Sequence, residues 1–118
     1  MLAPVYSTLM ANSDVTAIVG NRIFPAGNIP QGQPVPAVTW QSIAGTPQNL
    51  LSEAPPVDNQ RVQIDCWATT LVVADDLGSK VRAALQTKGY CISINGHDYD
   101  ADAKWYRSSF DFSFWLPP

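Results

Sequence analysis

The sequence predicts an α+β fold, in which residues 1 to 118 form a single domain with a mainly antiparallel sheet and two helices packed on one face. Three observations lead to this fold class. Residues 61 to 68 alternate apolar and polar side chains, as a strand with one buried side does. Residues 70 to 87 carry apolar side chains at helical spacing. A chain of 118 residues is long enough to bury roughly two thirds of its unfolded surface in one core.

The N-terminal region predicts helical structure ahead of the first strand. Pro4 suits the first turn of an N-terminal helix that we expect to extend to about Asn12. Ser13 and Asp14 are expected to cap a second, short helical turn, which Gly20 ends. This region supplies one of the two helices that we expect on the sheet, and the segment at about 70 to 87 supplies the other.

The sheet is expected to begin at Ile23 and Phe24 and to continue in residues 36 to 44, which are rich in β-branched and aromatic side chains. A loop of residues 26 to 36 without any charged residue separates the two strands, and a second loop follows at about residues 45 to 58. Prolines lack an N–H group and glycines add chain entropy, so both loops exclude regular structure. Loops of this length are suspected of binding roles.

The second half of the chain supplies the longer helix and the remaining strands. Thr70 is expected to cap the helix, and residues 90 to 94 are expected to form a strand that turns at Asn95-Gly96, a hairpin-type dipeptide. Residues from about 104 to 116 are expected to form a long final strand. The sheet then has one apolar face covered by helices and one polar face left for solvent or a partner. The apolar stripe of the helix comprises Ala74, Leu77, Val81, Ala84 and Leu85.

The chain is poor in charged residues. They make up 14% of the sequence, against about 25% in an ordinary soluble domain. A neutral polar surface favours a protein that is buried in an assembly, although a neutral soluble domain is the alternative. The seven basic residues are scattered and the net charge is −3, so we expect no direct nucleic-acid binding. No apolar run reaches the ~20 residues of a membrane span and the start lacks a signal-peptide pattern, so a cytoplasmic origin is expected.

Residues 97 to 102, HDYDAD, are the strongest candidate for a chemical site. Their carboxylates resemble the start of a calcium-binding loop. With Asp98 as the first ligand, however, Ala103 stands where a glycine is needed and Ser109 where a glutamate is needed. In an extended chain Asp98, Asp100 and Asp102 would project together and hold a hydrated cation weakly. An acidic, solvated turn is the favoured interpretation, and we expect no metal.

Catalytic and cofactor-binding motifs are missing from the sequence. His97 is the only histidine, and no G-x-S-x-G turn or phosphate-binding glycine loop is present. We therefore expect no enzyme activity and no cofactor. Cys66 and Cys91 lie in strand-like runs and are interpreted as small buried hydrophobic residues.

Four segments together resemble a known family. They are VTAIVGNRIFP (15 to 25), the proline-rich loop leading to PAVTW (36 to 40), RVQIDCWA (61 to 68) and the helix ending in VRAAL (81 to 85). In order and spacing they resemble the tail completion, or tail terminator, proteins of long-tailed bacteriophages. The resemblance implies a non-catalytic virion protein that is assembled in the host cytoplasm as a ring, usually a hexamer. Such a ring caps the head-proximal end of the tail tube, stops its growth and joins it to the head.

The resemblance also implies partners and an interface. The partners would be further copies of the chain, the tail tube protein and a head-completion or connector protein, with no nucleic acid or membrane. Arg22 is part of the family motif, and either an ion pair with a nearby carboxylate or a role between subunits would suit it. The alternative function is a small ligand- or metal-binding α+β domain that uses residues 97 to 102. The candidate interface residues, mostly amides of the two loops, are Asn28, Gln31, Gln33, Gln48, Asn49, Arg22 and Arg61.

Overall fold

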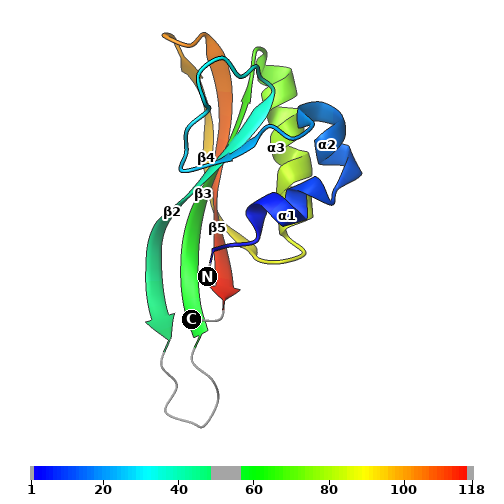
Figure 1. Ribbon diagram of the computed structural model, residues 1–118. Coiled ribbons are helices and arrows are strands. Elements are labelled where there is room, and N and C mark those ends of the chain that lie inside the picture. The colour runs from blue at the N-terminus through cyan, green and yellow to red at the C-terminus, as the bar shows by residue number, and fades with distance from the viewer. Residues whose placement is uncertain (1, 49–56, 117–118) are drawn as a thin grey trace.

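The computed structural model describes residues 2–48 and 57–116, which form a five-stranded sheet with three helices on one face (Figure 1). The strand order is β1-β2-β3-β5-β4. β1 is parallel to β2, and every other neighbouring pair is antiparallel. The predicted α+β class with a mainly antiparallel sheet is therefore confirmed. The strands are β1 (Ile23–Pro25), β2 (Ala37–Gln48), β3 (Val57–Ala68), β4 (Tyr90–Asp100) and β5 (Trp105–Leu116).

The helices are α1 (Val5–Met10), α2 (Ser13–Val19) and α3 (Leu71–Leu85), so the N-terminal region contributes two helices instead of one helix and a turn. Asn12 separates α1 from α2, because its backbone is extended and its side chain accepts hydrogen bonds from the backbone N–H groups of Asp14 and Val15. The predicted cap at Ser13 and Asp14 is therefore wrong by one residue. Within the described ranges, no helix has the length and apolar character needed to cross a bilayer.

The core lies between α3 and the middle of the sheet. The predicted stripe on α3 is buried in full, and Thr70 caps the helix by accepting a hydrogen bond from the N–H of Val73. Phe110, Phe112 and Phe114 of β5 form a row, in which the first two rings meet edge-on at a centroid distance of 5.6 Å and the last two stack at 5.8 Å. A Cβ atom on Gly78 would lie 2.7 Å from the Ser108 Oγ, so this glycine allows α3 to pack closely on β5.

The last hairpin differs from its prediction. β4 does not turn at Asn95-Gly96 but continues to Asp100, and the chain reverses at residues 101 to 104. Gly96 has a positive φ of 89° beside a register shift, which is a β-bulge within the strand. The turn is stabilised by Asp100, whose Oδ1 accepts hydrogen bonds from the N–H groups of Asp102 and Ala103. Gly96, which the sequence predicted to lie in a turn, lies at this bulge instead.

β2 and β3 are longer than predicted. They pair from Ala44 with Arg61 to Gln48 with Val57, so both ends of the expected 45 to 58 loop are strand. In Figure 1 these strand ends extend beyond the helices, and the molecule measures 51 × 27 × 24 Å. We call this extension, residues 42 to 48 and 57 to 61, the arm.

Candidate assembly surface

The sheet face that points away from the helices, here the open face, is polar as predicted but is not left to solvent. Thr39, Asp65 and Ser109 lie side by side across its centre on β2, β3 and β5. Thr39 is fully buried, and the exposed fractions of Asp65 and Ser109 are 3% and 5%. The face was expected to be left for solvent or a partner, and the structure closes its centre to solvent. Trp67 donates a hydrogen bond to Thr39 there, and the Gln63 amide donates to both carboxylate oxygens of Asp65.

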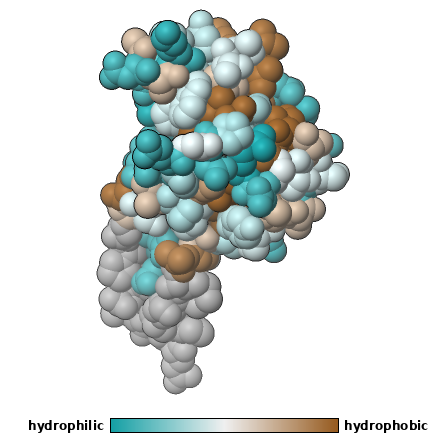
Figure 2. All heavy atoms as spheres, turned by 45° about the horizontal axis from the view of Figure 1, so that its top comes forward, coloured by the Kyte–Doolittle hydropathy of each residue, from teal (hydrophilic) through white to brown (hydrophobic). Residues whose placement is uncertain are grey.

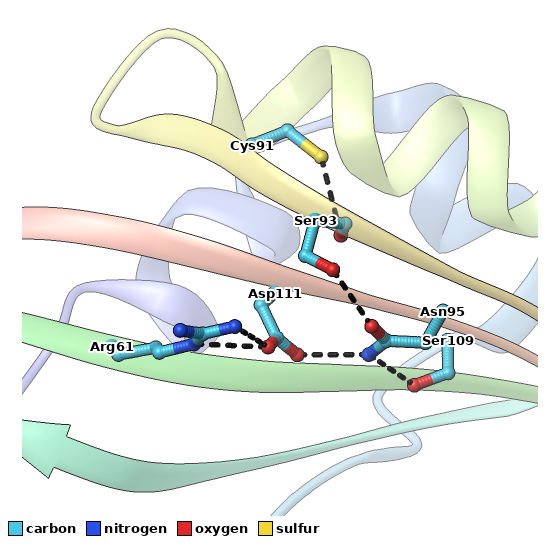
Figure 3. A network of polar contacts seen from close by, with 6 residues as sticks. All are labelled: Arg61, Cys91, Ser93, Asn95, Ser109 and Asp111. Carbon is cyan, nitrogen blue, oxygen red and sulfur yellow. Dashed lines mark hydrogen bonds and ion pairs between the residues drawn. The ribbon is translucent and has the colours of Figure 1, made fainter.

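One half of the open face is held by a network around Asp111 (Figure 3). Arg61 donates from Nε and Nη2 to the Asp111 Oδ2, at 3.0 and 2.7 Å. Asn95 donates from Nδ2 to the other carboxylate oxygen at 2.9 Å and to the Ser109 Oγ at 3.3 Å, and the Ser93 Oγ lies 3.0 Å from the Asn95 Oδ1. Side chains of β3, β5 and β4 are therefore joined across the strands, and both oxygens of a buried carboxylate are bound.

The other half of the open face carries aromatic side chains and an ion pair. Trp67 donates from Nε1 to the Thr39 Oγ1 at 3.0 Å, and the Trp105 ring lies edge-on to it at a centroid distance of 6.2 Å. The Arg107 guanidinium lies 5.5 Å from the centre of the Trp67 ring and is also hydrogen-bonded to Asp98. That hydrogen bond is the largest cause that raises the pKa of Arg107 above its usual value.

Arg22 bonds to backbone carbonyls of its own chain, and not to the carboxylate that one of the two sequence alternatives gave it. Its Nε donates to the backbone carbonyl of Pro36 at 2.9 Å, and its Nη2 donates to the carbonyl of Ile18 at 3.3 Å. The guanidinium thus links the last turn of α2 to the end of the 26 to 36 loop. Carbonyls at a helix C-terminus lack partners within the helix, which explains why a cation is suitable there.

The 26 to 36 loop is attached at its two ends and exposed between them. At one end the Gly27 N–H donates to the Trp40 carbonyl at 3.0 Å, and at the other Arg22 holds Pro36. Within the loop, the Gln33 N–H donates to the Pro30 carbonyl at 3.1 Å. The predicted interface amides Asn28, Gln31 and Gln33 are all exposed.

The remaining predicted interface residues lie elsewhere. Gln48 is the last residue of β2 on the arm, and Asn49 lies outside the described residues. The Arg61 side chain is 44% exposed but is already paired with Asp111. The loop and the arm lie at opposite ends of the sheet in Figure 1, so the predicted set does not form one patch.

Residues 97 to 102 are exposed and lead from the end of β4 into the turn before β5, in agreement with the favoured interpretation as an acidic, solvated turn, and their side chains have different hydrogen-bond partners. The His97 Nε2 lies 2.9 Å from the Asp75 Oδ1 of α3, whereas Asp98 pairs with Arg107 on the open face. Asp100 binds backbone N–H groups of the turn. Over residues 2–48 and 57–116, no three His, Cys, Asp or Glu side chains form a group that could hold a metal ion.

The two cysteines differ in burial. Cys66 is fully buried in the core, and this desolvation raises the pKa of its thiol. Cys91 is partly buried and packs against the core, with its Sγ 3.8 Å from the Ser93 carbonyl oxygen. Both are free thiols, in agreement with the interpretation as small hydrophobic residues.

Sequence reasoning missed a row of exposed apolar side chains on β4. Tyr90, Ile92 and Ile94 are 68%, 48% and 67% exposed. They recur every second residue, and this spacing was the available signal for apolar side chains that the core does not use. The register shift between Cys91 and Ser93 places Tyr90 opposite Ser113 on the open face and Ile94 opposite Phe110 on the helix-covered face, so the three do not share one side of the strand. On the face shown in Figure 2, apolar and hydrophilic residues are interspersed.

The chain was compared with known proteins. A family model described as "Tail completion protein gp17" matches residues 3–116. Among solved structures, a chain from the "Virion of native gene transfer agent (GTA) particle" superposes with a TM-score of 0.68 and 16% sequence identity, covering 97% of this chain and 92% of that chain. No curated protein sequence matches. The structural match shows a shared fold, and the family match covers nearly the whole chain.

Proposed function

Because the chain belongs to the tail completion protein gp17 family and is a structural protein of the phage tail, we propose that it completes the tail by capping its tube. In this proposal, copies of the chain form a hexameric ring on the head-proximal end of the tube. The ring stops tube growth and binds the head-completion or connector protein. The observation that carries the proposal is the family match over residues 3–116.

A cap of this kind needs two unlike ends. A tube grows by adding identical rings to an open end, so a terminating ring must bind the tube on one side and present a different surface on the other. The two ends of this molecule differ: one carries the 26 to 36 loop and the other the arm (Figure 1). This difference supports the proposal.

The 26 to 36 loop suits a contact with another protein. Its exposed amides both donate and accept hydrogen bonds, and burying them removes no charge from water. Attachment at Gly27 and Pro36 limits the chain entropy that binding would cost. We propose Asn28, Gln31 and Gln33 as contacts at one end, and Gln48 and Asn49 as contacts at the other.

The proposed role is binding without catalysis, at the neck of the virion after assembly in the host cytoplasm. Arg22 and Arg61 would act in it indirectly. Arg22 holds the end of the loop through the Pro36 carbonyl, and Arg61 holds the network that joins β3 to β5. Each would be a positioning residue for the surfaces around it.

Deleting the gene tests the function. We expect tails of uncontrolled length, or tails that do not join heads, and electron microscopy of the lysate measures both. Adding the purified protein should restore joining. Normal tails attached to filled heads in the deletion lysate would refute the proposed function.

The same complementation tests the loop. A chain with Asn28→Ala, Gln31→Ala and Gln33→Ala should fold normally, because these side chains are exposed, but should restore joining poorly. A matched control is Gln86→Ala with Lys88→Ala, which removes exposed polar side chains beyond the C-terminal end of α3. Equal restoration by both variants would remove the loop amides from the interface.

A further inference from the structure

The sheet has two edges with unpaired backbone. β4 is the last strand on one side, and β1 at the other side pairs only with residues Val38 to Trp40 of β2. The outer side of β4, and that of β2 beyond Trp40, has no strand partner in the part of the chain that the structure describes. Such edges are templates for pairing with another chain.

The free segments of the two edges are residues 90 to 96 (YCISING) and residues 41 to 46 (QSIAGT). Neither free segment carries a charged residue or a proline, two of the devices that protect an edge strand from pairing, and each carries the irregularity of a β-bulge, which is a third. Both segments contain a register shift, and the isoleucine at each shift, Ile92 on β4 and Ile43 on β2, is 48% and 44% exposed. The two edges are therefore alike in chemistry, and both suit burial.

The backbone of β2 is oriented for such pairing. The Val38 N–H donates to the Arg22 carbonyl, and the Trp40 carbonyl accepts from the Gly27 N–H, so alternate residues of β2 direct these groups to the outer edge. The same alternation directs the N–H and carbonyl groups of Ser42 outward, where β1 has already ended. Pro47 lacks an N–H group and limits the free segment at its far end.

Strand direction and height make the two edges complementary. Three antiparallel steps lead from β2 through β3 and β5 to β4, so β4 runs opposite to β2. In a ring whose subunits stand the same way up, β4 of one copy therefore meets β2 of the next in antiparallel orientation. Across the sheet, Ala44 pairs with Arg61, Arg61 with Ser113, and Ser113 with Tyr90. Ala44 and Tyr90 therefore lie at the same position along the strands. The free segments thus overlap in height over residues 41 to 44 of β2 and residues 90 to 93 of β4.

We propose that residues 90 to 95 of β4 pair antiparallel with residues 41 to 46 of β2 in a neighbouring copy, so that one sheet runs through adjacent subunits of the ring. The inference rests on the proposed function, since it names the contact that closes the ring. Backbone hydrogen bonds provide the attraction, as in other cases of strand addition. Ile43, Ile92 and Ile94 cover the junction. The contact joins two different surfaces of the chain, and such heterologous contacts form a ring when the rotation from one subunit to the next closes.

Cysteine pairs in assembled particles test the contact. In a chain with Cys91→Ala, the pair Ser42→Cys and Ile92→Cys should give, after mild oxidation, a ladder of cross-linked multimers on a non-reducing gel. Each single cysteine, and the matched pair Ser42→Cys with Val72→Cys, should give no ladder, because Val72 is 78% exposed but lies on α3. Complete particles that contain the protein and show no ladder above these controls would overturn the inference and leave the proposed function intact.

Charged edge variants provide an independent test. Ile92→Lys with Ile94→Lys on β4, or Ile43→Lys on β2, places a charge at an edge whose side chains are already exposed, so each variant should fold. Each should reduce the restoration of head-tail joining at least tenfold relative to Val72→Lys. If either edge variant restored head-tail joining as well as Val72→Lys does, the inference would be overturned. A deletion lysate with normal particles would instead refute the proposed function.

Discussion

The two faces of the sheet are built from the same strands but are stabilised by different physics. On β5, Phe112 points to the helices and is fully buried among apolar side chains, whereas its neighbour Asp111 points to the open face and is 5% exposed. The first face is covered by a helical layer and gains from non-directional burial of apolar area. The open face has no such layer and is closed by directional bonds between its own side chains. A sheet face can thus be buried without a covering element when its polar groups satisfy one another.

This difference affects what each face can offer a partner. Polar groups that are already paired, such as the Asp111 carboxylate, must lose bonds before they bind anything else. The centre of the open face is therefore a poor site for new contacts despite its polarity. The exposed loop amides and the unpaired strand edges are better sites. The following three predictions test the comparison between the faces.

The largest effect should come from the helix-covered face. Phe112→Ala should lower the free energy of unfolding by about 3–5 kcal/mol, because it removes a fully buried ring and leaves a cavity between its neighbours Phe110 and Phe114. Denaturant unfolding followed by tryptophan fluorescence measures the change. Phe112→Leu is the control and should cost less. A loss under ~1 kcal/mol for the alanine variant would mean that the row of phenylalanine rings contributes little to the stability of this face.

An intermediate effect is expected one residue earlier. Asp111→Ala should cost about 1–3 kcal/mol, since it leaves the Asn95 amide and the Arg61 guanidinium without their shared acceptor. Arg61→Ala should cost less, because the Asp111 carboxylate keeps its hydrogen bond from Asn95, and removal of an arginine side chain that is 44% exposed admits water to the freed oxygen. The same unfolding measurement applies. A cost for Asp111→Ala equal to that of Phe112→Ala would remove the distinction between the faces.

The smallest effect is expected where the open face reaches solvent. Asp98→Ala breaks the ion pair with Arg107, whose partners are 56% and 31% exposed, and should cost about 0.2–1 kcal/mol. High salt should reduce this cost further. Asp76→Ala, which breaks the exposed pair with Lys80 on α3, is the matched control and should behave alike. A much larger loss for Asp98→Ala that salt does not reduce would show that this pair belongs to the buried network.

Parts of the assembly surface were predictable because they are local. The absence of charge from the 26 to 36 loop and its prolines predicted an exposed segment, and Asn28, Gln31 and Gln33 are exposed. Their interface role stays a prediction. The β4 edge could not be recognised, because a strand becomes an edge only through the order in which all strands pair. Of the two alternatives for Arg22, the ion pair with a carboxylate was wrong, because its acceptors are the carbonyls of Ile18 and Pro36 in two separate segments, and the role between subunits stays a prediction.

The sequence by itself determined the elements whose signals repeat over short distances. The alternation of residues 61 to 68 specified the buried side of β3, and the stripe with its Thr70 cap specified α3, because side-chain direction follows backbone period within one element. Tertiary structure decided the rest. Asn95-Gly96 became a bulge and not a turn because Asn95 bonds to Asp111 and Ser109 on the adjacent strand. Asp65 is buried between Thr39 and Ser109 of the neighbouring strands, and the Gln63 amide binds both of its carboxylate oxygens. These outcomes depend on register between distant segments, which no local pattern encodes.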